Sequence, residues 1–254
     1  MKNLTGIDLS DFDKLSKEAV RKFWITRELA ANKQKTKGVK DTGLRSEVTG
    51  GKNMDGFEGL VRDIVVKNGL SENTIFTGRK LGAIPGFFRA TKVWDMVIVS
   101  ENNLVAALEF KSQVGSAGKD SYGKNQNNRI EEALGSSVDL WEAYSNGAFG
   151  ESPKPFVGWL MLVGDLPDAH KVVNNETSNF EIFPEFKGVS YIKRYNIFCR
   201  KLIQEQYYTA ASIIVSPPSA VNTGAYEEID QLTSLKTFIT SLAGHIAMAA
   251  ARLK

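Results

Sequence analysis

The most informative part of the sequence is Val93-Trp-Asp-Met-Val-Ile-Val-Ser-Glu-Asn-Asn-Leu-Val-Ala-Ala-Leu-Glu-Phe-Lys111. Its two ends, residues 93–99 and 104–111, are rich in apolar and β-branched side chains, which is typical of strands, and the polar residues between them predict a turn. Glu109 and Lys111 interrupt the apolar run of the second strand. Because they are two residues apart, their side chains project from the same face of the hairpin.

The length of the turn determines which side chain of the first strand lies opposite Glu109. A three-residue turn with a left-handed Asn103 pairs Ser100 with Leu104. In that register Asp95 lies opposite Glu109, with about 5 Å between the Cβ atoms. A two- or four-residue loop would move Asp95 to the other face, unless a bulge or splayed strands restored the register. The other pairs of the expected register are Val99–Val105 and Val97–Ala107.

Two facing carboxylates repel each other unless a cation joins them. Lys111 partly neutralises Asp95 and Glu109, and the remaining space suits a hard divalent cation such as Mg²⁺, which takes oxygen ligands. The alternative is a solvent-facing strand edge with an incidental salt bridge, because short signatures of this kind occur often by chance.

Patterns around the hairpin predict an α/β (α+β) fold with a mixed central β-sheet flanked by helices. Helical periodicity and strand-like apolar runs follow in the order helix, strand, strand, strand, helix, strand. Asn53 is the expected cap of the first of these helices and Gly69 its end. The run at 156–163 is apolar enough for a strand buried on both faces. The expected elements are helices at 53–68 and 127–144 and strands at 74–80, 93–99, 104–111 and 156–163.

Further elements are expected outside this core. A helix over residues 10–34 begins with Ser10 and Asp13 spaced like a capping box, and residues 211–215 form a strand. The C-terminal segment predicts an amphipathic helix, which either packs on the core of its own chain or forms a dimer contact. Its apolar positions are Leu232, Leu235, Phe238, Ile239, Leu242 and Ile246.

Composition narrows the functional classes. The chain has 254 residues, 42% apolar and 24% charged, as in ordinary globular proteins. One cysteine and two histidines exclude a disulfide framework, a zinc finger and a three-histidine zinc site, and they argue against nucleases that depend on clustered histidines. The net charge of +3 permits a polyanionic partner without requiring one. The single cysteine favours a reducing cytoplasm as the location. No signal peptide or membrane span is expected.

Four ordered blocks carry a resemblance to a known family. They are TGGKNMDGF at 49–57, PGFFRATKVWD at 85–95, EFKSQVG at 109–115 and NNRIEEA at 127–133. These blocks resemble the XhoI family of type II restriction endonucleases, closely over residues 45–165. Asp95 with Glu-Phe-Lys at residues 109–111 also resembles the PD-(D/E)xK nuclease core, with Trp94 in place of the motif's proline.

The resemblance implies a PD-(D/E)xK restriction-endonuclease-like core in which Asp95, Glu109 and the backbone carbonyl of Phe110 bind Mg²⁺. Lys111 would position the attacking water and stabilise the developing charge. Glu58 is the expected further acid from the preceding helix, or else a plain surface glutamate.

The implied substrate is double-stranded DNA with a palindromic hexamer of the CTCGAG kind. A homodimer would cut it, one subunit on each strand, and a cognate methyltransferase is expected in the same system. Candidate DNA contacts flank the hairpin, and each can instead be a solvated charge, a helix cap or, for the glutamine, a loop-capping amide. They are Arg89, Lys92, Gln113, Lys119, Lys124, Asn127, Asn128 and Arg129. The basic segment 33–52 is either a DNA-touching arm or a solvated linker.

We expect a single nuclease domain over residues 1–254. It comprises an N-terminal helix and basic arm (1–48), a catalytic core (49–165) and a C-terminal extension (166–254). Three alternatives stay open: a repair or structure-specific nuclease on the same core, a non-catalytic DNA-binding protein, and a methyltransferase. The last is prompted by Ser-Pro-Pro-Ser at 216–219, which lacks the aromatic residue that such catalytic loops carry.

A second stretch fits the literal nuclease motif, with Pro167-Asp168 followed by Glu-Phe-Lys at 185–187. Its context is wrong for a catalytic strand, because Pro184 cannot donate to a central ladder and the residues before it are loop-like. We therefore do not expect a site there.

Overall fold

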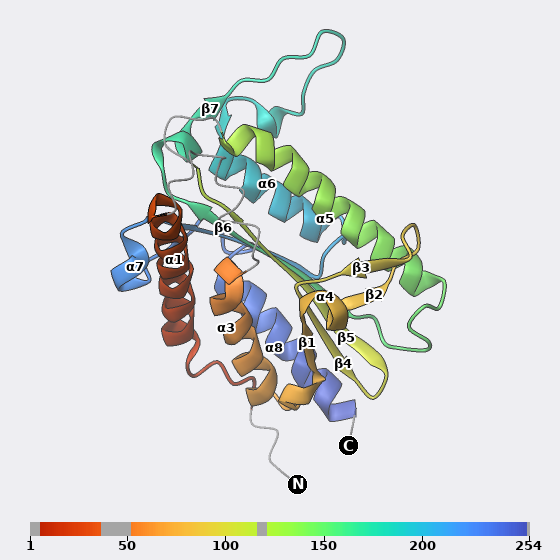
Figure 1. Cartoon of the computed structure of the whole chain (residues 1–254). Helices are drawn as coiled ribbons and strands as arrows, with labels where there is room; N and C mark the ends of the chain where they lie inside the picture. The colour runs from red at the N-terminus through yellow and green to blue at the C-terminus, as the bar shows by residue number, and fades with distance from the viewer. Residues whose placement is uncertain (1–5, 37–51, 116–120, 253–254) are drawn as a thin grey trace.

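The computed structural model describes residues 6–36, 52–115 and 121–252, and it is built around a six-stranded sheet (Figure 1). The strand order is β1-β4-β5-β6-β9-β10. β5, β6 and β9 are parallel, and the other neighbouring pairs are antiparallel. The predicted mixed sheet is thereby confirmed. The strands are β1 (Ile75–Thr77), β4 (Met96–Ser100), β5 (Asn103–Gln113), β6 (Phe156–Gly164), β9 (Ala210–Ser216) and β10 (Glu227–Glu228).

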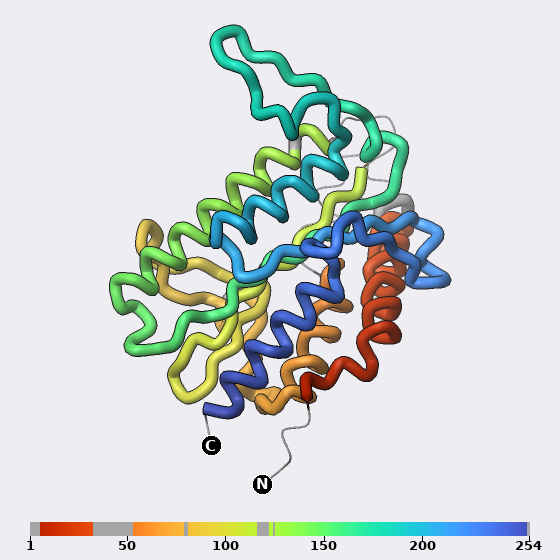
Figure 2. The backbone as a smooth tube through the Cα atoms, turned by 180° about the vertical axis from the view of Figure 1, so that it is seen from behind, coloured from red at the N-terminus to blue at the C-terminus, as the bar shows by residue number. Residues whose placement is uncertain are grey.

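Helices cover both faces of this sheet. α1 (Phe12–Thr36), α3 (Asp55–Lys67) and α8 (Leu235–Arg252) lie on one face, and α5 (Ser121–Ser145) and α6 (Tyr191–Gln204) lie on the other (Figures 1 and 2). Every residue of β6 is buried, as its continuous apolar run predicts for a strand covered on both sides.

The C-terminal amphipathic helix packs on its own chain. The apolar stripe of α8 is buried against β9, β6 and α3, so this face is occupied by the core. The structure therefore assigns the five predicted positions from Leu235 to Ile246 to the core of the same chain, whereas Leu232 lies before α8 and is only partly buried. None of the described helices is long and apolar enough to cross a bilayer.

Short elements connect this framework. They are η1 (Lys52–Met54), η2 (Glu72–Thr74), α4 (Gly78–Leu81), β2 (Ala83–Pro85), β3 (Thr91–Val93), η3 (Pro167–His170), β7 (Val172–Val173), η4 (Pro184–Phe186), β8 (Val189–Ser190) and α7 (Ala220–Thr223). β2 and β3 form a separate two-stranded hairpin beside α5, and β7 pairs with β8.

Several expected boundaries were wrong for local reasons. The strand expected at 74–80 ends at Thr77, because Gly78 takes a left-handed conformation (φ +83°) and starts α4. Met54 rather than Asn53 precedes α3, and no side chain caps that helix. At the start of α1, the Ser10 hydroxyl donates to Asp8 instead of serving a capping box.

The central hairpin reaches the expected register by a different route. Its turn has two residues, Glu101 and Asn102, both left-handed (φ 47° and 63°), so Val99 pairs with Leu104. The register then shifts between Ile98 and Val99, and Val97 faces Ala107 as predicted. The shift is a β-bulge on β5, where two consecutive residues, 105 and 106, both pack into the core under α1, α3 and α8. The bulge restores the alternation that turns residues 109 and 111 towards α5.

The first strand of the hairpin is interrupted, contrary to the expected continuous strand at 93–99. β3 ends at Val93 and β4 begins at Met96. Trp94 lies in the break, where its side chain is buried and its backbone N–H donates to the carbonyl of Gly82 at 2.9 Å. Asp95 is therefore carried by a kink in the chain beside β5, not by a strand in the ladder.

Candidate active site

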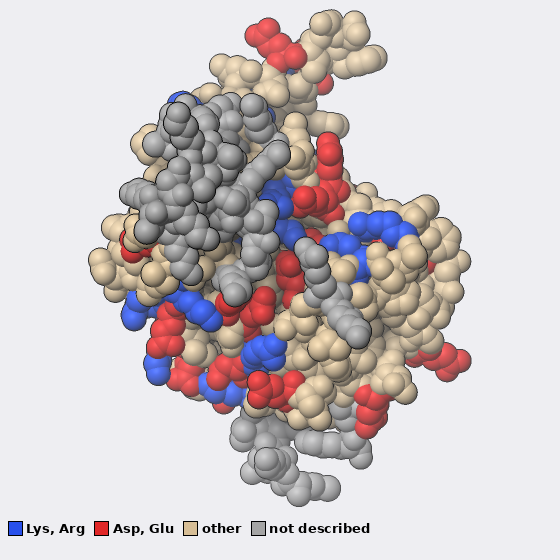
Figure 3. Space-filling view, in the orientation of Figure 1, with Lys and Arg blue, Asp and Glu red and all other residues tan. Residues whose placement is uncertain are grey.

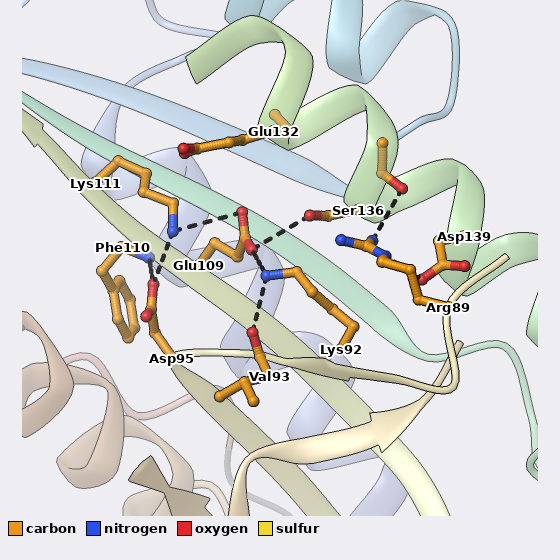
Figure 4. A network of polar contacts seen from close by, with 12 residues as sticks. Arg89, Lys92, Val93, Asp95, Glu109, Phe110, Lys111, Glu132, Ser136 and Asp139 are labelled. Atoms are coloured by element: carbon orange, nitrogen blue, oxygen red, sulfur yellow. Dashed lines mark hydrogen bonds and ion pairs between the residues drawn. The ribbon is translucent and has the colours of Figure 1, made fainter. Parts of the chain in front are cut away.

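Glu109 is buried between β5 and α5, with 1% of its side chain exposed (Figure 4). Its Oε1 accepts a hydrogen bond from Lys92 Nζ at 2.5 Å and lies 3.5 Å from Ser136 Oγ. Its Oε2 makes no hydrogen bond to any described residue. A buried carboxylate oxygen without a donor is destabilising unless an ion, a ligand or a water molecule contacts it.

Lys111 contacts the two carboxylates of the motif. Its Nζ lies 3.4 Å from Asp95 Oδ2 and 3.8 Å from Glu109 Oε2 (Figure 4). Burial lowers the pKa of Lys111, but the negative charges of Glu109 and Asp95 together raise it by more. The pKa therefore lies above its ordinary value. The side chain is therefore an ammonium ion at neutral pH, placed between two acids.

Asp95 is held by the strand that it faces. Its Oδ2 accepts a hydrogen bond from the backbone N–H of Phe110 at 2.8 Å, in addition to the contact with Lys111. The Asp95 side chain is 40% exposed, whereas Glu109 is covered by α5. The site thus combines one solvent-open acid with one buried acid.

Glu58 lies on α3 and is partly buried. Burial raises its pKa, and the negative charges of Asp55 and Asp95 raise it further. The electrostatic effect of Asp95 places Glu58 in the neighbourhood of the motif. It lies outside any tight cluster, because no three His, Cys, Asp or Glu side chains among the described residues come close enough together to hold a metal ion by themselves.

A divalent cation would consequently depend on few protein ligands. The oxygens that fit it are the donor-free Oε2 of Glu109, the open carboxylate of Asp95 and a backbone carbonyl such as that of Phe110. An all-oxygen set with few protein ligands is what Mg²⁺ takes, because Mg²⁺ usually keeps several of its waters. The residues present therefore fit this ion.

The residues predicted to contact DNA lie in different places: some lie in the site, some lie on α5, and some fall outside the described residues. Lys92 lies inside the site on Glu109, and Gln113 is buried on the same face of β5. Arg129 pairs with Glu132 at 2.7 Å on α5, about two helical turns before Ser136. Asn127 and Asn128 are exposed on α5. Lys119, most of the basic segment and the side chain of Lys124 lie outside the described residues.

Arg89 is tied to α5. Its Nε lies 3.0 Å from Asp139 Oδ2, while Asp139 Oδ1 accepts hydrogen bonds from the backbone N–H groups of Phe87 and Phe88. Burial raises the pKa of Asp139, but the hydrogen bonds from Phe88 and Arg89 outweigh it, so the pKa lies below its ordinary value. This carboxylate anchors the tip of the β2–β3 hairpin.

Replacing Asp139 with Asn is expected to destabilise the protein by about 1.5–3 kcal/mol at pH 7, the usual contribution of a hydrogen bond to a charged group. Because the folded-state pKa is lowered, ionisation of Asp139 contributes stability above the unfolded-state pKa of 3.8. That contribution is lost as the pH falls through the folded-state pKa. Urea denaturation of both proteins should show a gap that closes below about pH 4. A gap that is constant between pH 7 and pH 3 would contradict the assignment.

Sequence reasoning did not find two residues of the surroundings, Ser136 and Asp139. Both are buried polar residues on α5, and they are three positions apart, as are Ala133 and Ser136. Polar side chains on the inward stripe of an amphipathic helix are the signal that could have identified them.

The second literal motif is not assembled. Asp168 pairs with Lys171, and Glu185 pairs with Lys201. Lys187 pairs with Glu181. These acids have separate partners on separate short elements and form no common site, as their sequence context predicted.

The surroundings of the site are strongly charged. Figure 3 shows basic and acidic side chains close together in the middle of the face that carries α5 and the adjoining sheet. Such a mixture can hold a phosphate and a cation at once, as metal-assisted phosphodiester hydrolysis does.

Comparison with known proteins identifies the family. The sequence profile of restriction endonuclease XhoI matches residues 33–228. The chain belongs to the XhoI restriction endonuclease family. It is therefore an endonuclease, and the candidate site lies within the matched region.

Three type II restriction enzymes align with most of the chain. The type II restriction enzyme BstVI of Geobacillus stearothermophilus is 44% identical over 84% of this chain and 95% of its own length. The type II restriction enzyme AbrI of Azospirillum brasilense is 50% identical over 65% and 72%, respectively. The type II restriction enzyme XhoI of Xanthomonas vasicola is 40% identical over 84% of each chain. No solved structure matches the chain.

Proposed function

We propose that this restriction endonuclease hydrolyses phosphodiester bonds in double-stranded DNA by a Mg²⁺-dependent reaction at the hairpin site. The observation that carries the proposal is the position of Lys111, whose ammonium group contacts both Asp95 and Glu109 beside a buried oxygen without a donor. An arrangement of one cation and two acids on neighbouring segments matches the chemistry that cleavage of a phosphodiester needs.

Each side chain has a separate task in this proposal. Asp95, Glu109 and the carbonyl of Phe110 would hold the Mg²⁺ ion. When bound, the ion would polarise the phosphate and lower the pKa of a water molecule. Lys111 would orient the attacking water and stabilise the negative charge that develops on the phosphate. Glu58, whose pKa is raised, would act as an additional acid near Asp95.

The family also supports proposals about the substrate and the assembly. We propose a short palindromic target of the CTCGAG kind, cut by a homodimer because each subunit supplies one active site for one strand. The single nuclease domain expected from the sequence is the unit that pairs. A cognate methyltransferase in the same system would protect host DNA from cleavage. Arg129, Asn127 and Asn128 on α5 remain proposed DNA contacts.

Digestion of a plasmid in the presence of Mg²⁺, followed by sequencing of the product ends, tests the proposed function. Discrete fragments with a common palindromic end are expected, and EDTA should abolish them. A smear of products would favour a repair or structure-specific nuclease. DNA binding without cleavage at any Mg²⁺ concentration would favour a non-catalytic DNA-binding protein.

A further inference from the structure

The β2–β3 hairpin exposes two aromatic rings at its tip. Phe87 is 50% exposed and Phe88 is 68% exposed, and their ring centroids lie 5.0 Å apart in an edge-to-face arrangement. Burying a phenylalanine side chain stabilises a protein by about 1.5–3 kcal/mol. Phe87 and Phe88 each lack a large part of this stabilisation because their rings are exposed.

Hydrogen bonds of the backbone at the tip keep the two phenylalanine rings exposed. Asp139 is almost completely buried and accepts hydrogen bonds from the N–H groups of Phe87 and Phe88 at 2.9 and 2.7 Å. Arg89 Nε donates a hydrogen bond to the other oxygen of this carboxylate, Oδ2, at 3.0 Å. A Cβ atom at Gly86 would lie 2.4 Å from Asp139 Oδ2, so only glycine allows this approach. The anchored loop therefore holds the two rings outwards.

The same hairpin reaches the active site. β3 carries Lys92, whose Nζ contacts Glu109. Lys92 lies four positions after Phe88, which is at most about 13 Å of extended chain. The major groove of B-form DNA is about 12 Å wide and admits a two-stranded β-ribbon. A duplex with a phosphate at Glu109 and Lys111 therefore brings its groove within reach of the rings.

We propose that the tip of the β2–β3 hairpin enters the major groove of the target and that Phe88 contacts the C5-methyl group of a thymine. Thymine is the base that offers an apolar group at this edge, and apolar side chains read it by direct contact. Phe87 supports Phe88 from the side through the edge-to-face contact. The inference rests on the proposed function, because it requires a specific DNA sequence as the substrate.

The test measures binding in Ca²⁺ without cleavage, using a 20-base-pair duplex centred on the site that product-end sequencing of the wild-type enzyme gives. The comparison duplexes are a scrambled sequence and a set in which uracil replaces one thymine at a time, which removes only the methyl group. Phe88→Ala should reduce discrimination between the target and scrambled duplexes by about tenfold. One uracil position should weaken binding of the wild type by about fourfold and leave binding of Phe88→Ala unchanged.

The matched control is Phe180→Ala. Phe180 is 83% exposed in the segment between β7 and β8. Its substitution therefore removes an exposed ring from another part of the molecule. Its discrimination should equal that of the wild type. Equal discrimination by Phe88→Ala and the wild type, or a target without thymine, would overturn the inference. Dissociation of a dimer by Phe88→Ala with discrimination unchanged would also overturn it, because the rings would then contact a second copy of the chain. In each of these results the wild type still cuts at discrete sites, whereas failure of the proposed function would remove the discrete sites themselves.

Discussion

Glu109→Ala is expected to lower the rate of Mg²⁺-dependent cleavage by roughly a thousandfold or more, while DNA binding in Ca²⁺ is largely retained. The substitution removes the buried carboxylate whose Oε2 has no hydrogen-bond donor among the described residues. Lys111→Ala should have a comparable effect, because no other described ammonium group contacts both Asp95 and Glu109. Single-turnover cleavage of a labelled duplex measures the rate, and circular dichroism checks that each variant is folded.

Glu185→Ala is the matched control for this experiment. Glu185 occupies the corresponding position of the second literal motif, but it is paired with Lys201 away from the site. Its loss should leave the cleavage rate unchanged. Normal cleavage by Glu109→Ala would end the assignment, and loss of cleavage by Glu185→Ala would move the site to the second motif.

Lys92→Met is expected to destabilise the folded protein by about 2–4 kcal/mol, because it leaves the buried carboxylate of Glu109 without its closest cation. Lys92 Nζ lies 2.5 Å from Glu109 Oε1, donates to the carbonyl of Val93 at 2.8 Å and lies 5.4 Å from the centroid of the Trp94 ring. Lys111 stays 3.8 Å away and limits the loss. Urea denaturation at pH 7 measures the free energy of unfolding.

The double variant Lys92→Met/Glu109→Gln should recover much of this loss, since the unpaired charge is then absent. Lys201→Met is the control, because Lys201 pairs with Glu185 at 2.8 Å and also lies near two phenylalanine rings, but at the surface. A surface pair contributes about 1 kcal/mol or less. A loss in Lys92→Met no larger than that in Lys201→Met would show that the Lys92–Glu109 contact does not stabilise the fold.

The secondary structure around the site could be predicted because it depends on local periodicity. The apolar run of β6 predicted a strand covered on both sides, and all nine of its residues are buried. The alternation of Glu109 and Lys111 along β5 predicted that the two share a face, and both contact the same charged cluster. The amphipathic stripe of α8 predicted a packed helix but not its neighbours, because periodicity specifies a face and not what covers it.

The contacts that make the site depend on residues far apart in the chain. Lys92 meets Glu109 across 17 positions, Ser136 meets Glu109 across 27, and Arg89 meets Asp139 across 50. No local pattern specifies such a pair, and the bulge in β5 that aims Glu109 at α5 is likewise set by packing on the two faces of the sheet. The spacing of neighbouring side chains was therefore enough to predict most of the core strands and helices and the shared face of Glu109 and Lys111, but not all of the element boundaries or the break in the chain at Trp94 and Asp95. That face is surrounded by Asp95 in the break between β3 and β4, by Lys92 of the β2–β3 hairpin and by the buried polar residues of α5. Only the tertiary structure shows this arrangement, because it follows from how separate elements pack.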